Sequence, residues 1–345
     1  MKKIITVVIV LFALGIGVGA YFYNRLFMSN VEIKGAEKAY IYIRSEADFA
    51  EVLDTLKPYL CDVSSFTQVA ELKKYPKLIK PGKFEIKNEW SNVELVDYLR
   101  SGNQVEIKLV FNYANSIEDM AGKVSKQISA DSLEILNYVY SDDFLKKNNF
   151  TKENVPAIFI PNTYHVYWNT SAEDFVNRMF VEYKKFWNKE RIARAKEIKL
   201  TPMEVSILAS IVQKETAKKS ERKVIAGLYM NRLNNNWRLE SCPTVLYAIE
   251  KESNFTIKRN RLLYDDLQME TPYNTYKNSG LPPGPISIPE MDAIDAVLHY
   301  QKNSYFYMNA SVDKPGYNVF SKSLRQHNIN AKKYQAWLNK QNIKK

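Results

Sequence analysis

The first pattern along the chain is an apolar run from Ile4 to Tyr23, with a single threonine as its only polar interruption. A run of about twenty such residues matches the hydrocarbon thickness of a bilayer. Lys2 and Lys3 precede the run, and a short basic tail favours the cytoplasmic side of a membrane. The pattern predicts a cytoplasmic tail at 1–3 and a transmembrane helix at 4–24.

A cleaved signal peptide is the competing interpretation, because it also begins with lysines and an apolar stretch. The run is longer than a usual signal core, and no clear small-x-small cleavage site follows Ala20. We therefore expect a single-pass protein of the cytoplasmic (inner) membrane. Everything beyond the helix then lies on the extracytoplasmic, or periplasmic, side.

After this run, apolar positions alternate as in strands or recur as in helices, in the order strand, helix, helix, strand. The predicted elements are a strand at 39–43, helices at 45–57 and 65–74, a strand at 83–86 and a further helix at 92–99. Ser45 and Asp48 resemble a capping box at the start of the first helix. This order predicts a small α+β subdomain, with its linker, at 25–103.

The remaining residues, 104–345, mix the two periodicities over a longer stretch, which predicts a larger mixed α+β domain. A segment rich in Pro, Gly, Asn and Tyr at 271–290 predicts an ordered loop. The predicted strands are 105–111, 305–308 and 317–320, and the predicted helices are 117–128, 133–140, 172–196, 201–218, 221–234 and 330–342.

The best-defined helix is the one predicted at 201–218. Thr201 stands at the N-cap position, Pro202 at the first helical position and Glu204 at the third. This is the capping-box pattern, with proline where a helix tolerates it.

This helix carries a carboxyl group on its apolar side. At about 100° per residue, Leu208, Ile211 and Val212 form one stripe, and Glu215 lies one turn beyond Ile211 on that stripe. Gln213 is expected on the polar side. A carboxyl group that loses water holds its proton more tightly, and a protonated Glu can act as the general acid that glycosidic cleavage needs.

A simpler interpretation of Glu215 is a residue near a helix end that reaches solvent or pairs with Arg222 or Lys219. Helical geometry alone leaves both interpretations open.

Charge and composition add limits to this picture. The net charge is +11, which would suit nucleic acid, but the predicted topology keeps the folded part away from it. Anionic lipids, acidic wall polymers or plain solvation account for the basic surface. Cys61 and Cys242 form no CxxC pattern, and the three histidines have no metal-ligand spacing. We expect no metal, no other cofactor and no nucleic-acid partner.

Several motifs resemble one known family. The segment Ile207–Thr216 resembles the active-site helix of the endolytic murein transglycosylases, the MltG or YceG-like family. Further matching stretches follow in the family's order over about residues 155–330. They are Asn231–Leu233, Cys242–Tyr247, Thr271–Tyr276, Gly280–Ile286, Phe320-Ser321 and His327-Asn328.

The resemblance implies roles for single residues. The family's catalytic Glu corresponds to Glu215. Many relatives have a second Glu where this chain has Gln213, and commonly an Asp where it has Asn162. Asn274, Thr275, Tyr276 and Thr244 are candidates for substrate binding, although the loop residues among them are as well explained by shaping the loop. The family's N-terminal region resembles a LysM-like glycan-binding unit, which matches the small α+β subdomain predicted here.

The resemblance also implies the reaction and the partners. The substrate is the β-1,4 bond between N-acetylmuramic acid (MurNAc) and N-acetylglucosamine (GlcNAc) in peptidoglycan glycan strands. Glu215 first donates a proton to the leaving oxygen and then accepts one from the MurNAc C6 hydroxyl. This leaves a 1,6-anhydro end and terminates or releases nascent strands. The membrane is a partner, and peptidoglycan synthases are further candidates.

Two other functions remain open at this point. A hydrolytic muramidase would need a second acid near Glu215. A non-catalytic peptidoglycan-binding scaffold would not need Glu215 at all. The acids available for the first alternative are Glu221, Glu240, Glu270 and Asp266.

Overall fold

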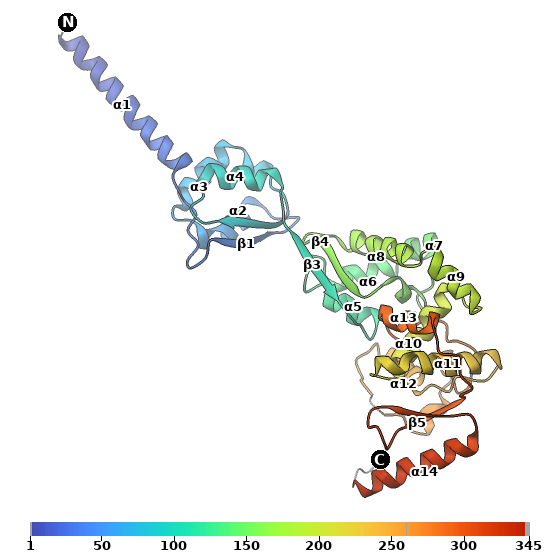
Figure 1. The fold of residues 1–345 in the computed structure, drawn as a ribbon. Helices are drawn as coiled ribbons and strands as arrows, with labels where there is room; N and C mark the ends of the chain where they lie inside the picture. The colour runs from blue at the N-terminus through green and yellow to red at the C-terminus, as the bar shows by residue number, and fades with distance from the viewer. Residues whose placement is uncertain (1, 260, 342–345) are drawn as a thin grey trace. The chain divides into compact units, whose positions relative to one another are not determined.

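The structure is a computed structural model that describes residues 2–259 and 261–341, and it has the mixed α+β character that the sequence predicts (Figure 1). The chain divides into two compact units, each with its own hydrophobic core. Unit 1 comprises Met1–Leu109, Gln127–Ala130 and Tyr164–Ser171, and unit 2 comprises Val110–Lys126, Asp131–Thr163 and Ala172–Lys345.

The chain begins with a single long helix, α1 (Lys2–Phe27), drawn in blue in Figure 1. Its segment Lys3–Phe27 is long and apolar enough to cross a membrane, and its most apolar part is not buried inside the protein. The predicted apolar helix is therefore present, and it continues a few residues beyond position 24. An apolar helix needs about twenty residues to match the hydrocarbon thickness of a bilayer, and this exposed apolar segment is long enough.

Unit 1 is built on two antiparallel strands, β1 (Lys38–Ile43) and β2 (Gly82–Lys87). Side chains alternate across a strand, so one face of this sheet receives the apolar set. That set is at most 2% exposed and consists of Ile41, Ile43, Phe84 and Ile86. Three helices complete this core and confirm the predicted order: α2 (Phe49–Leu56), α3 (Val63–Leu72) and α4 (Asn92–Ser101).

The predicted capping box at the first of these helices is wrong. The N-cap is Asp48, whose side chain accepts a hydrogen bond from the backbone N–H of Glu51. The helix therefore begins at Phe49, and Ser45 lies outside it. Asp is as good an N-cap as Ser, so the two residues competed for one role in the sequence pattern.

The middle of the chain contributes several short elements. Strands β3 (Glu106–Phe111) and β4 (Asn162–Tyr167) form a two-stranded sheet, and β4 is absent from the sequence prediction. Asn162, the position where relatives commonly have Asp, is the first residue of β4 and is exposed. The helices of this part are α5 (Ile117–Val124), α6 (Ser132–Val139) and α7 (Asp142–Asn148).

One helix, α10 (Pro202–Glu215), lies at the centre of the core of unit 2 and contacts α11, α12 and α13. The predicted long helix at 172–196 is two helices, because Asn188 caps a new one after the buried Trp187. The helices are α8 (Ala172–Phe186), α9 (Lys189–Glu197), α11 (Arg222–Asn234), α12 (Cys242–Glu252) and α13 (Met291–Leu298).

The last elements are a hairpin-like pair of strands and a helix that packs against both strands. Strands β5 (Tyr307–Ala310) and β6 (Asn318–Ser321) are antiparallel and confirm the predicted pair, shifted by one or two residues. The final helix, α14 (Leu324–Lys340), begins six residues before its predicted start at 330 because Ser323 caps it. The predicted end at 342 lies outside the described residues.

Candidate active site

The helix that carries Glu215 begins as the sequence predicts. Thr201 accepts a hydrogen bond from the backbone N–H of Glu204, and the Glu204 carboxylate accepts one in return from the N–H of Thr201. The helix ends at Glu215, three residues earlier than predicted. The backbone of Thr216 is extended, and its hydroxyl accepts a hydrogen bond from the backbone N–H of Lys218.

The prediction for Gln213 is wrong. Gln213 is buried, and its Oε1 accepts a hydrogen bond of 2.7 Å from the backbone N–H of Glu290. The cause is the central position of α10. Its residues 205–213 are all buried, so this helix has no solvent-facing polar side over that stretch.

Two hydroxyl groups hold the Glu215 carboxyl group. The Tyr229 hydroxyl on α11 donates to Oε1 at 2.6 Å, and the Ser241 hydroxyl donates to the same oxygen at 2.5 Å. Oε2 has no hydrogen-bond partner among the residues that the structure describes. One oxygen is therefore fixed by the protein, and the other is left for a ligand.

Ser241 shows how this arrangement is built. It is the N-cap residue of α12, where a serine normally caps the helix with its own hydroxyl. No such capping bond forms, because the hydroxyl is directed to Glu215 instead. The backbone N–H of Ser241 donates to the Thr275 hydroxyl at 2.9 Å, which fixes the start of the helix from the other side.

Burial raises the pKa of Glu215, while the hydrogen bonds from Ser241 and Tyr229 and the charge of Arg232 oppose that rise. The net direction is upward, so the neutral acid is favoured at a higher pH than for a free Glu. Burial also raises the pKa of Tyr229 well above its ordinary value, and the neighbouring Glu215 acts in the same direction. Tyr229 therefore remains a hydrogen-bond donor.

Glu215 is half-buried and lines a cavity of about 420 Å³. This is within the usual range for small-molecule sites. The cavity has aromatic, apolar, amide and charged groups on its walls, which suits a ligand with both flat faces and hydroxyls. Its other lining residues include Tyr229, Arg232, Glu240, Cys242, Tyr276, Tyr307, Met308, Asn309, Asn318 and His327.

Arg232 provides the positive charge of this cavity. It is held by backbone carbonyls, with Nε donating to Phe306 at 2.8 Å and Nη1 to Leu239 at 2.6 Å. It also forms an ion pair of 3.3 Å with Glu240. Burial, together with Arg232, lowers the pKa of His327, which favours a neutral imidazole in the wall.

Of the predicted substrate-binding residues, only Tyr276 reaches the cavity. Asn274, Thr275 and Thr244 are at most 1% exposed. Asn274 donates to the carbonyls of the preceding loop, and the Thr275 and Thr244 hydroxyls lie 2.9 Å apart. The structure does not present these three side chains to a ligand. They hold the loop and the start of α12 in place.

The sequence interpretation missed Tyr229 and Ser241 as parts of the site. Tyr229 and Ser241 lie 14 and 26 positions from Glu215, so no local periodicity connects them. A signal for Ser241 did exist, since a serine before Cys-Pro is typical of a helix start.

Of the four other acids named above, only Glu240 lines the cavity of Glu215. Glu221 is buried and accepts hydrogen bonds from Thr216 and Asn318. Glu270 pairs with a lysine, and Asp266 pairs with an arginine, in the loops around 259–277.

Within residues 2–259 and 261–341, no group of three or more His, Cys, Asp or Glu side chains could hold a metal ion. Cys61 and Cys242 are free thiols. Cys242 lies 3.0 Å from the Tyr276 hydroxyl in the cavity wall.

The chain is similar to several known proteins. The sequence profile described as the YceG-like family matches residues 41–333. The protein named endolytic murein transglycosylase of Bacillus subtilis (strain 168) is 34% identical over 195 residues, which cover 56% of this chain and 51% of the relative. The protein of the same name from Streptococcus pneumoniae (strain D39) is 27% identical over 297 residues. These residues cover 77% of this chain and 52% of the relative.

The chain thus spans about half the length of these curated relatives. A crystal structure of a YceG-like protein from Listeria monocytogenes is also similar. It has 26% sequence identity and a TM-score of 0.56, and the match covers 85% of this chain and 98% of that one.

Proposed function

The chain belongs to the YceG-like family, and from this premise we propose that it is a membrane-anchored lytic transglycosylase that cuts the glycan strands of peptidoglycan. The name shared by its relatives supports cleavage within strands. The proposed bond is the β-1,4 linkage between MurNAc and GlcNAc, and the proposed role is to terminate or release nascent strands.

The observation that supports catalysis is the state of the Glu215 carboxyl group. Oε1 accepts two hydrogen bonds, so both of its lone pairs are occupied. The proton of the neutral acid then resides on Oε2, the oxygen without a protein partner. Because burial raises the pKa of Glu215, this proton is retained beyond the usual range of a Glu.

The proposed reaction uses this one group twice. Glu215 Oε2 donates its proton to the glycosidic oxygen as the bond from that oxygen to the MurNAc anomeric carbon breaks. The C6 hydroxyl of the same sugar then attacks the anomeric carbon, and its proton returns to the Glu215 carboxylate. The product has a 1,6-anhydro ring, and no water is consumed.

A single carboxyl group is enough for this reaction. Ordinary glycosidases use two, because either water or an enzyme carboxylate must attack the sugar. Here the nucleophile belongs to the substrate, so the attack is intramolecular and gains from proximity.

The remaining site residues have supporting roles in this proposal. Tyr276 offers its ring and hydroxyl to the sugar from the cavity wall. Asn274, Thr275 and Thr244 act indirectly, because they fix the loop that presents Tyr276 and the helix start that presents Ser241.

A hydrolytic muramidase is the second candidate, because Glu240 lines the same cavity as Glu215. Its carboxylate is engaged by Arg232, which favours a fixed charge over a base that activates water. A non-catalytic scaffold has less support, since it would not require the arrangement around Glu215.

The anchor and the small domain complete the proposal. We propose that residues 4–24 cross the cytoplasmic membrane, with 1–3 inside and the folded units on the extracytoplasmic side. The uncovered apolar surface of α1 supports this. We also propose that 25–103 is a LysM-like glycan-binding subdomain and that 104–345 is the catalytic domain. Peptidoglycan synthases are proposed partners.

The test is product analysis on intact sacculi with the full chain in detergent micelles. We expect glycan fragments that end in 1,6-anhydro-MurNAc, one water lighter than hydrolytic fragments. Glu215→Gln should abolish them, whereas Glu240→Gln should still release anhydro products. Hydrolytic fragments that depend on Glu240 would instead establish the muramidase. If neither the parent protein nor the Glu240→Gln variant digests sacculi, the enzymatic proposal is rejected.

A further inference from the structure

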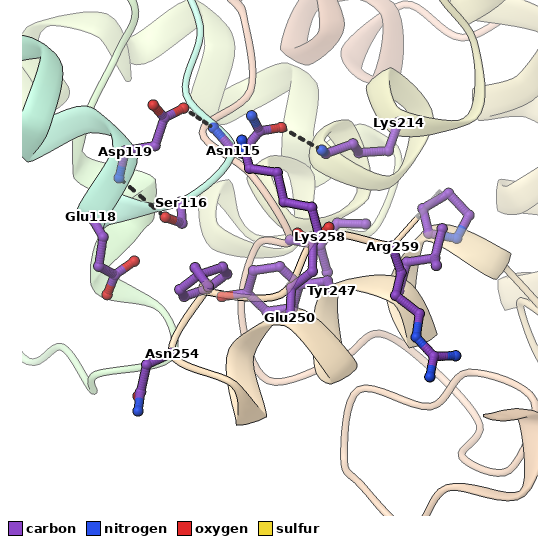
Figure 2. Close-up of a pocket in the computed structure, with 14 residues that line it drawn as sticks. Asn115, Ser116, Glu118, Asp119, Lys214, Tyr247, Glu250, Asn254, Lys258 and Arg259 are labelled. Atoms are coloured by element: carbon purple, nitrogen blue, oxygen red, sulfur yellow. Dashed lines mark hydrogen bonds between the residues drawn. The ribbon is translucent and has the colours of Figure 1, made fainter. Parts of the chain in front are cut away.

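A second cavity, of about 550 Å³, is lined in part by two helices that also line the catalytic cavity. Figure 2 shows the residues that line this second cavity. Helix α12 contributes to both, since Cys242 lines the Glu215 cavity while Leu246 and Glu250 line the second one. Helix α10 contributes to both as well, through the consecutive residues Lys214 and Glu215. Nothing in the reaction proposed above uses this second space.

The second cavity continues into a third of about 350 Å³. The two share Asn115, Ser116, Glu118, Tyr247, Asn254 and Phe255 as lining residues. They are therefore parts of one groove in unit 2, referred to below as the Lys214 groove. Together the two cavities offer more space than a single small ring requires.

Charges of both signs face the Lys214 groove. Lys214 donates a hydrogen bond of 2.7 Å to Asn115 Oδ1 and makes no ion pair with the described carboxylates, so two of its three donors are free. Lys258 is a second cation of the lining. Glu250 and Glu118 provide the opposite charge, and the Glu250 carboxylate has neither an ion pair nor a hydrogen bond among residues 2–259 and 261–341.

Two buried polar atoms of the groove have no hydrogen-bond partner in the part of the chain that the structure describes. Glu118 accepts the Tyr140 hydroxyl on Oε1, but its Oε2 is buried without a hydrogen bond. Ser287 is 2% exposed, lines the third cavity, and has a buried hydroxyl with no partner. Buried polar groups are nearly always hydrogen-bonded, so such atoms indicate a polar ligand or water at this place.

The walls between these charges are apolar or aromatic, formed by Pro243, Leu246, Tyr247 and Phe255. A ligand that fits needs carboxylates for the lysines, an ammonium group for the glutamates, and small aliphatic parts between them. A short peptide with an amino side chain has this chemistry, and a neutral glycan does not.

We propose that the Lys214 groove binds the short peptide that muramic acid carries in peptidoglycan. This inference rests on the proposed function, and it adds the recognition of the stem peptide to it. The sugar in the catalytic cavity and the peptide in the groove would lie on either side of α12. A helix with side chains is about 10–12 Å across. Four extended residues span about 13 Å, so a stem can reach from one cavity to the other.

The first experiment measures binding without catalysis. The probe is the tetrapeptide L-alanyl-γ-D-glutamyl-L-lysyl-D-alanine, titrated against the full chain in detergent micelles. We expect saturable binding that weakens at least fivefold in Glu118→Gln and in Glu250→Lys. Acetylation of the lysyl amine should weaken binding to the unsubstituted protein to a similar extent. The matched control is Glu252→Lys, an exposed position on the same helix that lines neither cavity.

The second experiment compares glycan strands with and without stems. We expect the ratio of kcat/KM for stem-bearing over denuded strands to exceed ten, to fall toward one in Glu250→Lys, and to stay unchanged in Glu252→Lys. Equal cutting of both strands together with no peptide binding would overturn the stem site and leave the proposed function standing. Peptide binding without any cutting would overturn the proposed function instead.

Discussion

Lys214 and Glu215 are consecutive residues at the end of one helix, yet they enter different cavities and face opposite surroundings. Burial favours the neutral form of both, since it raises the pKa of Glu215 and lowers the pKa of Lys214. In each case the neighbouring groups oppose burial. Hydroxyl donors and an arginine lower the pKa of Glu215, and the carboxylates of Glu250 and Asp119 raise the pKa of Lys214.

This comparison of Lys214 and Glu215 indicates which cavity is suited to catalysis and which to ligand recognition. A carboxyl group that holds a proton in a partly dry site can transfer that proton. An ammonium group beside carboxylates can bind a ligand of mixed charge through ion pairs and hydrogen bonds.

Replacing the two neighbours should have very different effects on turnover. Glu215→Gln removes the transferable proton while preserving shape, and loss of a general acid costs about 10²–10⁴-fold in rate. Lys214→Gln should lower kcat less than about threefold, because Lys214 acts through recognition. The measurement is the initial rate of anhydro-end formation on sacculi. Similar losses in both variants would contradict the separation of roles.

The hydrogen bond from Tyr229 should tune the acid. Tyr229→Phe removes a donor to Oε1, and that donor lowers the pKa of Glu215. Without it the pKa of Glu215 rises further, so the alkaline limb of the pH–rate profile should move to higher pH. The rate at the optimum should fall about tenfold, because a weaker acid donates its proton less readily and its carboxylate loses a stabilising hydrogen bond. The profile is the decisive readout.

Tyr183→Phe is the control for Tyr229→Phe. Tyr183 packs against the same core but lies away from the cavity, so this variant should leave the profile in place. An unshifted alkaline limb in Tyr229→Phe would show that Tyr229 has only a packing role.

The features of α10 that depend on nearby residues could be predicted from the sequence, and those that depend on packing could not. The start of α10 could be predicted because the reciprocal bonds of Thr201 and Glu204 are local. The position of Glu215 could be predicted because helical periodicity is local too. Gln213 was misplaced because the pattern was interpreted as a helix with one buried side, and only packing shows that α10 is covered all around.

The groups that define the chemistry come from distant parts of the chain. The hydroxyls of Tyr229 and Ser241 converge on one oxygen only after α11 and α12 pack against α10. The break between α8 and α9 was missed for a related reason. The aromatic and charged pattern continues through Trp187, and the cap at Asn188 is outweighed in the sequence by good helix formers on both sides.

The raised pKa of Glu215 also predicts a pH dependence of stability. The native carboxyl group binds its proton more tightly than the unfolded one, so its contribution is fully present below about pH 4.5 and is lost as pH rises through the native pKa. Glu215→Gln carries no such group. Its free energy of unfolding should therefore gain on the parent by up to about 1.4 kcal/mol per pH unit within that window, and level off above it.

Urea unfolding of the full chain in micelles at several pH values measures this gain. Leu133→Ala, an exposed position without a titrating group, should differ from the parent by the same amount at every pH. A constant difference for Glu215→Gln as well would mean that Glu215 is solvated like a surface acid.

The smallest expected effect belongs to the far end of α10. Thr201→Ala removes the side-chain cap and the reciprocal bond with Glu204, which should cost about 1 kcal/mol of stability. Because α10 carries both Lys214 and Glu215, anchored by packing along residues 205–213, the loss should appear in unfolding and not in either cavity. Cutting rate and peptide affinity should each change less than twofold below the unfolding transition. A selective loss of one of them would mean that the two residues are positioned independently, and that the helix end is looser than its buried length implies.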